Sequence, residues 1–310
     1  GARSRPGFSP DDALREIFAL QARGAFNPAT DDRRVLLLNT RLRLDPQDVA
    51  ARLELAAVYE RYGLFEDALD QYTRALNLEP SDAAAAGVAR AAGASGSGAE
   101  VIPLLEAFLK RAAEPRPETA EVWNELGMLQ DAAGRHPAAE QAFRRATELA
   151  PNSDRLHNNL GYNLLLQNVL EAAEAHFRHA LRLNPGSTAA RNNLGMTLAR
   201  RGDLDAARRE FLAAADPATA HNNLAVALIE MGEYEQGRAE LVKALQARNY
   251  FAPAIENFKL VRELLRQRAE APTAAGRLPL STLRVPAALA ARRVPDRNVG
   301  NKPETRENSP

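Results

Sequence analysis

The side chains in this sequence that could take part in chemistry are few and scattered. His176 and His179 stand three residues apart in a helical pattern, a spacing at which two imidazoles on one helical face could share a metal ion. No carboxylate or further histidine stands at a complementary spacing, so solvation or packing is the favoured role of this pair. The sequence has no glycine-rich phosphate loop, no nucleophile elbow and no Ser, His and Asp constellation. We therefore expect no enzyme activity, no cofactor and no metal.

Composition narrows the class of protein further. The 310 residues have a formal net charge of +0 and are 45% hydrophobic, which is typical of a folded chain and not of a nucleic-acid binder. There is no cysteine, so disulfides and thiolate metal sites are excluded. No run of about 18 apolar residues is present, so we expect no transmembrane segment. Because the chain begins at Gly1 without Met, we expect a signal segment or the natural start to have been removed.

One residue pattern recurs along the middle of the chain. Its first copy consists of Trp123, Leu126, Gly127, Ala139, Phe143, Ala146 and Pro151. The same offsets return 34 residues later at His157, Leu160, Gly161, Ala173, Phe177, Ala180 and Pro185. A third copy contains Leu194, Gly195, Ala207, Phe211 and Ala214. A fixed period of this length is typical of repeats that each form one helical hairpin.

The elements that must carry this pattern are two antiparallel helices per repeat. Small residues are needed where the helix axes cross closely, which explains Gly127 in the first helix and Ala139 in the second. We expect Leu126, Leu160, Leu194 and Leu224 to fill the layer beside these contacts. We expect Phe143, Phe177 and Phe211 to pack between one repeat and the next.

The repeat period also predicts the segment boundaries in the rest of the chain. Residues 93–98 are glycine and serine rich and predict a flexible break, and Ala215 to Pro217 leads almost directly into the next helix. The predicted segments are a disordered N-terminus 1–10, a degenerate helical repeat 11–48, a full repeat 49–80, a degenerate repeat with the Gly/Ser break 81–119, full repeats 120–153 and 154–187, a shortened repeat 188–217, a full repeat 218–251, a capping helix 252–270 and a disordered Pro/Arg-rich tail 271–310.

The recurring residues resemble the tetratricopeptide repeat family from about residue 49 to residue 251. The resemblance implies an all-α solenoid, a right-handed superhelix of antiparallel helix pairs, and a concave groove that binds a protein or peptide. In that family the groove is lined mainly by positions 2, 5, 9, 12 and 13 of each repeat. Position 5 gives an unbroken row, Asn124, Asn158, Asn192 and Asn222. Position 9 gives an apolar row, Met128, Tyr162, Met196 and Val226, and position 13 adds Arg200.

The asparagine row has two possible roles. A carboxamide offers both a donor and an acceptor, so a row of them can pair with the backbone of an extended peptide whatever its sequence. Adjacent Met and Tyr residues would then accept apolar side chains of the peptide. Alternatively, these asparagines hydrogen-bond neighbouring backbone. A second row, Asn159, Asn193 and Asn223, stands at position 6, and we interpret it as structural.

The run from His157 to Gly161, with near copies at Arg191 and His221, resembles the TadD group of tight-adherence pilus proteins. This resemblance implies an accessory factor in assembly of a bacterial pilus or secretion complex, located in the cell envelope or periplasm. A membrane anchor would then require a lipidation cysteine before Gly1. The alternatives are a cytoplasmic location and a regulatory or substrate-recruiting subunit of an enzyme complex. The basic tail is interpreted as a solvated linker and not as a nucleic-acid or membrane contact.

Overall fold

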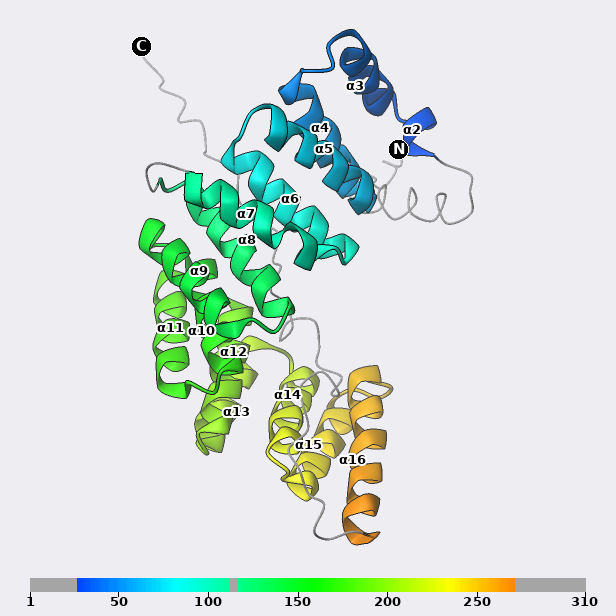
Figure 1. Ribbon diagram of the computed structural model, residues 1–310. Helices are drawn as coiled ribbons and strands as arrows, with labels where there is room; N and C mark the ends of the chain where they lie inside the picture. The colour runs from blue at the N-terminus through cyan, green and yellow to red at the C-terminus, as the bar shows by residue number, and fades with distance from the viewer. Residues whose placement is uncertain (1–26, 112–115, 271–310) are drawn as a thin grey trace, which may run out of the picture. The chain divides into compact units, whose positions relative to one another are not determined.

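The computed structural model describes residues 27–111 and 116–270, and this part of the chain is helical without any strand (Figure 1). The prediction of an all-α fold built from helical hairpins is confirmed. The chain divides into two compact units, Gly1–Leu156 and His157–Pro310, which we call unit 1 and unit 2. No helix among the described residues is long and apolar enough to cross a membrane.

Unit 1 contains a short entry segment followed by three hairpins. Its helices are α2 (Pro28–Asp31), α3 (Arg33–Leu44), α4 (Val49–Arg61), α5 (Phe65–Leu78), α6 (Asp82–Ser95), α7 (Gly98–Arg111), α8 (Thr119–Ala132) and α9 (His136–Leu149). Polar caps set several helix starts. For example, Asp48 accepts from Ala51 N at 2.8 Å ahead of α4, and Ser81 accepts from Ala84 N at 3.3 Å ahead of α6. The hairpins are α4 with α5, α6 with α7, and α8 with α9.

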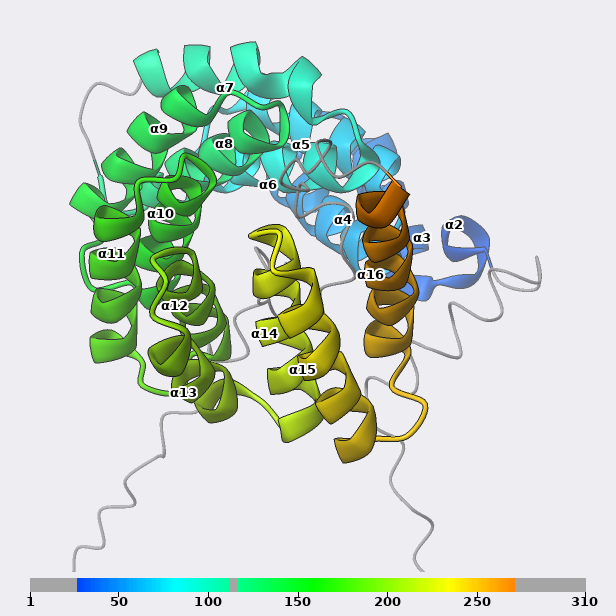
Figure 2. The same ribbon diagram turned by 90° about the horizontal axis from the view of Figure 1, so that it is seen from below.

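Unit 2 continues the same arrangement and ends on a long helix. The helices are α10 (Asp154–Leu166), which begins three residues before the unit boundary, α11 (Leu170–Leu183), α12 (Thr188–Arg200), α13 (Leu204–Ala214), α14 (Pro217–Glu230), α15 (Tyr234–Ala247) and α16 (Ala252–Glu270). Figure 2 shows α12 with α13 and α14 with α15 as antiparallel pairs. The first helices of the hairpins, α10, α12 and α14, are followed by α16, which packs on both α14 and α15.

In three hairpins, α8 with α9, α10 with α11 and α12 with α13, the close approach of the paired helices depends on one glycine and one phenylalanine. A Cβ atom at Gly161 would lie 2.8 Å from the Phe177 ring, and one at Gly195 would lie 2.8 Å from the Phe211 ring. Gly127 has the same relation to Phe143. We expected these phenylalanines to pack between successive repeats, but each ring lies against the glycine of its own hairpin. The reason is that only a glycine leaves room for an aromatic ring at the helix crossing.

The leucine layer is confirmed. Leu126, Leu160, Leu194 and Leu224 are all buried. The glycine and serine segment differs from the expectation of a long flexible break. Helix α6 continues through Gly93 to Ser95, and only Gly96 and Ser97 separate it from α7. Gly96 has a φ of 90°, a left-handed conformation that ends α6 in a tight turn.

The short connection before α14 has a clear local cause. Helix α13 has 11 residues and ends at Ala214, and α14 starts at Pro217. Between them, Asp216 caps α14 by accepting from Ala218 N at 3.1 Å and from Thr219 N at 3.3 Å. Pro217 has no N–H, so it fits the first position of a helix. The predicted disordered N-terminus 1–10 and tail 271–310 lie outside the described residues.

Candidate functional site

Three members of the predicted asparagine row, Asn158, Asn192 and Asn222, lie on first helices of unit 2, and each contacts the next helix of this series. Asn193 Nδ2 on α12 donates to Asn158 Oδ1 on α10 at 3.0 Å. Asn223 Nδ2 on α14 donates to Asn192 Oδ1 on α12 at 3.1 Å. The last bond of the series, from Asn257 Nδ2 on α16 to Asn222 Oδ1 on α14, is 3.0 Å long. One hydrogen bond between side chains therefore connects each first helix to the next.

This arrangement corrects the expectation that the row faces an open groove with both amide atoms free. Asn192 and Asn222 are 0% exposed and Asn158 is 6% exposed. The side-chain oxygens of all three are occupied by the asparagine donors of the following helix. In unit 1, Asn124 is also 0% exposed, and its Nδ2 lies 3.6 Å from Met128 Sδ on the same helix. The carboxamide oxygens of unit 2 thus hold hairpins together.

In two of these asparagines, the side-chain NH₂ group makes no such hydrogen bond. Asn192 Nδ2 and Asn222 Nδ2 are shielded from solvent and have no hydrogen-bond partner in the part of the chain that the structure describes. They occupy equivalent positions in successive hairpins. A buried amide donor without a partner is destabilising by about 1–3 kcal/mol, so such groups are uncommon in folded proteins.

The side chains of the apolar row at repeat position 9 are mostly buried. Met196 and Val226 are buried, as is Met128 in unit 1, whereas Tyr162 on α10 is only half-buried. The expectation that all four side chains are open to a ligand is therefore wrong for three of them. Tyr162 is the member of this row with an accessible surface.

Arg200 connects three first helices of unit 2. Its Nη1 donates to the carbonyl oxygen of Leu165 on α10 at 2.8 Å, and its guanidinium pairs with the Glu230 carboxylate on α14. The two charged side chains are 15% and 12% exposed. Arg200 was predicted as a partner contact, but the structure gives it a position between helices instead.

The histidine pair predicted on the second helix gains a third member. His157 Nδ1 on α10 lies 3.2 Å from His176 Nδ1 on α11, and the His157 and His179 ring centroids are 4.1 Å apart. Burial, together with the nearby His157 and Arg182, lowers the pKa of His179. Within the described residues no group of three or more potential ligands could hold a metal ion. The sequence pattern missed His157 because it belongs to the other helix.

Unit 1 carries a buried carboxylate where unit 2 carries asparagine. Glu125 on α8 stands at the repeat position of Asn159 and is buried. Burial and repulsion from Glu121 raise the pKa of Glu125 to about 7, although Arg90 and Arg155 oppose the shift. Sequence analysis overlooked this residue. The available signal was an acidic residue at a position that is asparagine in the three following repeats.

Comparisons with known proteins agree with the repeat pattern. A family model described as tetratricopeptide repeat matches residues 87–154 and 158–223, and a second one of the same description matches residues 218–251. Comparison with curated proteins finds no match.

Several solved structures are similar in fold. A chain of the APC/C hetero-tetramer Cut9–Hcn1 matches 82% of this chain with a TM-score of 0.54 and 18% identity. This chain spans about half, 49%, of that chain's length. The pilF protein of Pseudomonas aeruginosa matches 70% of this chain and 99% of its own, with a TM-score of 0.53 and 20% identity. A tetratricopeptide repeat protein from Parabacteroides merdae matches 81% of this chain and 98% of its own, with a TM-score of 0.54 and 16% identity.

Proposed function

Because the chain belongs to the tetratricopeptide repeat family, whose members typically mediate interactions between proteins, we propose that it is a non-catalytic scaffold that binds an extended segment of a partner protein. The proposed contact surface in unit 2 is the row of first helices α10, α12 and α14, which we call the first-helix wall.

The observation that carries this proposal is the pair of unused donors, Asn192 Nδ2 and Asn222 Nδ2. Main-chain carbonyls of an extended segment are suitable acceptors for them, because such a segment presents carbonyls at regular intervals along its length. The matching side-chain oxygens are already bonded to Asn223 and Asn257, which fixes the orientation of both amides. The wall would therefore donate to the backbone of its partner and accept nothing from it.

Neighbouring residues supply the rest of the contact. Tyr162 offers a half-buried ring to an apolar side chain of the partner, whereas Met196 and Val226 at the same repeat position are buried. Since the two amide nitrogens are shielded, a bound segment must displace the groups that cover them. Arg200 supports the wall by holding α10, α12 and α14 together.

The test uses substitutions that remove the donor and keep the acceptor. A fluorescein-labelled 12-residue peptide is first selected on the full chain from a random display library. Its affinity is then measured by calorimetry for Asn192→Asp and Asn222→Asp, in which an oxygen replaces Nδ2. Asn249→Asp adds the same charge at an exposed turn and serves as the matched control.

We expect each wall variant to weaken peptide binding by about tenfold, the loss of roughly 1.4 kcal/mol, while the control stays within about twofold. Unchanged affinity in both wall variants would contradict the proposal. Tyr162→Leu provides a second test if the buried aspartates perturb folding, as judged by circular dichroism. It removes the aromatic contact and should also weaken binding.

The cellular role that we propose is that of an accessory factor in assembly of a bacterial pilus or secretion complex. It is supported by the TadD-like residue runs and is compatible with the fold similarity to pilF of Pseudomonas aeruginosa. Deleting the gene should reduce surface pili in electron micrographs, and the tagged chain should co-purify with pilus components. Normal piliation in the deletion strain would contradict this role and leave peptide binding untouched. Co-purification with a glycosyltransferase or kinase would favour the alternative role of an enzyme subunit.

A further inference from the structure

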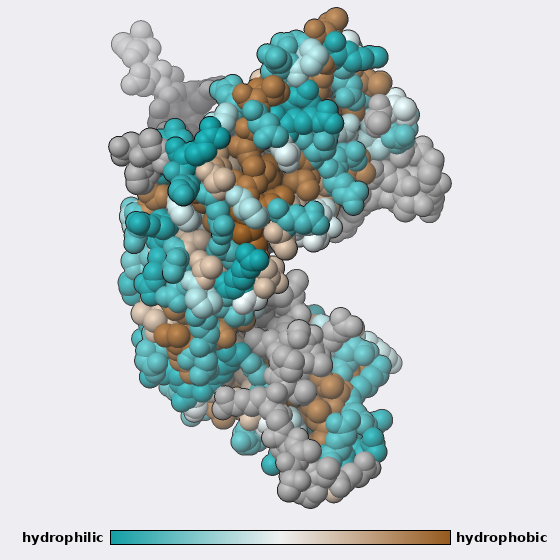
Figure 3. All heavy atoms as spheres, in the orientation of Figure 1, coloured by the Kyte–Doolittle hydropathy of each residue, from teal (hydrophilic) through white to brown (hydrophobic). Residues whose placement is uncertain are grey.

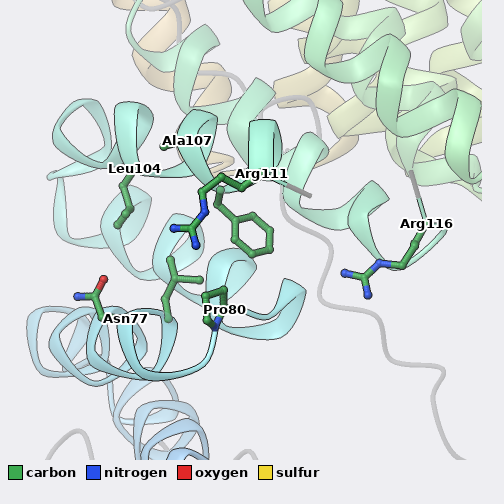
Figure 4. A pocket seen from close by; sticks show the side chains of 8 residues that line it. Asn77, Pro80, Leu104, Ala107, Arg111 and Arg116 are labelled. Atoms are coloured by element: carbon green, nitrogen blue, oxygen red, sulfur yellow. The ribbon is translucent and has the colours of Figure 1, made fainter. Parts of the chain in front are cut away.

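Unit 1 contains a surface pocket that the proposed peptide wall does not use. It lies between the end of α5 and the second half of α7 and has a volume of about 460 Å³ (Figure 4). Helices α5 and α7 are the second helices of their hairpins, so the pocket is separate from the first helices. Figure 3 shows apolar atoms gathered over this part of unit 1. A volume of this size is sufficient for one or two large side chains.

The pocket has an apolar base. Leu76 and Pro80 contribute from the end of α5, and Leu104 and Phe108 contribute from α7. Leu76 is buried in the core, while Leu104 and Phe108 are only partly buried and pack against that core from above. The base is therefore continuous with the hydrophobic core of unit 1, which gives a ligand a rigid apolar surface.

The rim of the pocket is positively charged. Arg116 lines one side and pairs with Asp82 at 2.9 Å, but its side chain remains 57% exposed. Arg111 lines another side and has no ion pair within the described residues. Figure 4 shows the two guanidinium groups well separated across the opening. Arg111 is therefore open to a first carboxylate, and the exposed face of the Arg116 guanidinium can take a second one beside Asp82.

We propose that this pocket binds a segment of a partner protein in which a large apolar side chain is flanked on both sides by aspartate or glutamate. The apolar side chain enters the base formed by Leu104 and Phe108, and the flanking carboxylates pair with Arg111 and Arg116. The chain's own C-terminal residues 271–310 have the wrong charge for this role, with seven Lys or Arg against three Asp or Glu. The separation of the arginines favours a peptide with two acidic groups over a fatty acid with one.

The test uses the full chain and a defined probe. The probe is a capped, fluorescein-labelled peptide with the central sequence Glu-Asp-Leu-Phe-Asp-Glu between Gly-Ser linkers, and binding is followed by fluorescence anisotropy. Arg111→Glu reverses one rim charge, and Ala107→Trp places a ring over the pocket without changing charge. Lys110→Glu is the matched control, because Lys110 precedes Arg111 on α7 and does not line the pocket.

We expect Arg111→Glu and Ala107→Trp each to weaken probe binding by about tenfold or more, and Lys110→Glu to stay within about twofold. A probe with Ser-Ser in place of Leu-Phe should bind at least about tenfold more weakly. If Arg111→Glu and Lys110→Glu lost equal amounts of probe affinity, the binding would be general charge attraction, and the proposal would be overturned. The proposal would also be overturned if the chain bound a fluorescent fatty acid but not the peptide probe, and if Ala107→Trp abolished that fatty-acid binding. Self-association of the chain that Ala107→Trp removes would overturn it too.

Discussion

Asn193 Nδ2 donates to Asn158 Oδ1 across 3.0 Å and so connects α12 to α10 through two adjacent rows of asparagines. Here an asparagine of the second row reaches back to an asparagine of the first row on the preceding first helix. This relation is repeated between α14 and α12 and between α16 and α14. The solenoid of unit 2 is thus held by buried amide pairs as well as by apolar packing.

Replacing one member of a pair should destabilise unit 2 more than replacing both. Asn193→Leu leaves Asn158 Oδ1 buried without its donor, which we expect to lower the free energy of unfolding by about 1–3 kcal/mol. The double variant Asn158→Leu and Asn193→Leu should recover part of this loss. Urea denaturation followed by circular dichroism measures both. A double variant whose loss equals the sum of the two single losses would show that the pair is not coupled.

The glycine and phenylalanine contact predicts a steric effect. Gly195→Ala places a Cβ atom 2.8 Å from the Phe211 ring and should destabilise the chain by about 1–3 kcal/mol. Gly186→Ala is the control, because a Cβ atom there meets only Asn184 Oδ1, at 3.4 Å. Adding Phe211→Leu to Gly195→Ala should restore some stability relative to Phe211→Leu alone. Thermal melting would refute the steric explanation if both alanine variants behaved alike.

The Arg200 and Glu230 pair predicts an asymmetry between single and double substitutions. Arg200→Leu leaves the Glu230 carboxylate without its cation and should lower the free energy of unfolding by about 3–5 kcal/mol. Arg200→Leu combined with Glu230→Leu removes both charges and should lose much less. Guanidinium denaturation of the single and double variants provides the measurement. If the double variant is the less stable of the two, the charge argument fails.

Glu125 predicts a pH dependence in unit 1. Its pKa is raised from 4.5 to about 7, so between these values the folded chain holds a proton that the unfolded chain releases. The free energy of unfolding should therefore fall as the pH rises through this window, by up to about 3 kcal/mol. Glu125→Gln should remove this slope and stabilise the chain at pH 8.

The control for this prediction is Glu118→Gln, at an exposed residue just before α8. Melting temperatures between pH 4.5 and pH 8 should run parallel for this variant and the wild type. Only Glu125→Gln should diverge, with the difference growing toward pH 8. An unchanged slope in Glu125→Gln would assign the pH dependence to groups other than Glu125.

The fold was predictable because the recurring leucines and glycines make their contacts within each hairpin. Leu160 and Leu194 fill the same layer in each hairpin, and Gly161 and Gly195 permit the same close crossing. The residues of the asparagine row were also found from their spacing. Their role was not, because a repeat offset does not say whether an amide points to solvent or to the next helix.

Other features required coordinates for a related reason. His157 joins His176 and His179 only through the packing of α10 on α11, 19 residues apart for the first pair. The pocket of unit 1 combines Leu76 with Leu104 and Arg111, which no sequence spacing connects. A repeat offset specifies neither the contacts between the two helices of one hairpin nor those between successive hairpins, so both sites required coordinates.

The central claim is that the unused donors of Asn192 and Asn222 hold an extended partner segment on the first-helix wall. The most direct measurement is the NMR spectrum of side-chain amides in the ¹⁵N-labelled full chain during titration with the selected peptide. The Nδ2 resonances of Asn192 and Asn222 should shift as the peptide binds, while those of Asn193 and Asn257, already bonded within the wall, should stay in place. Saturation of the protein with peptide while the Asn192 and Asn222 resonances remain fixed would contradict the claim.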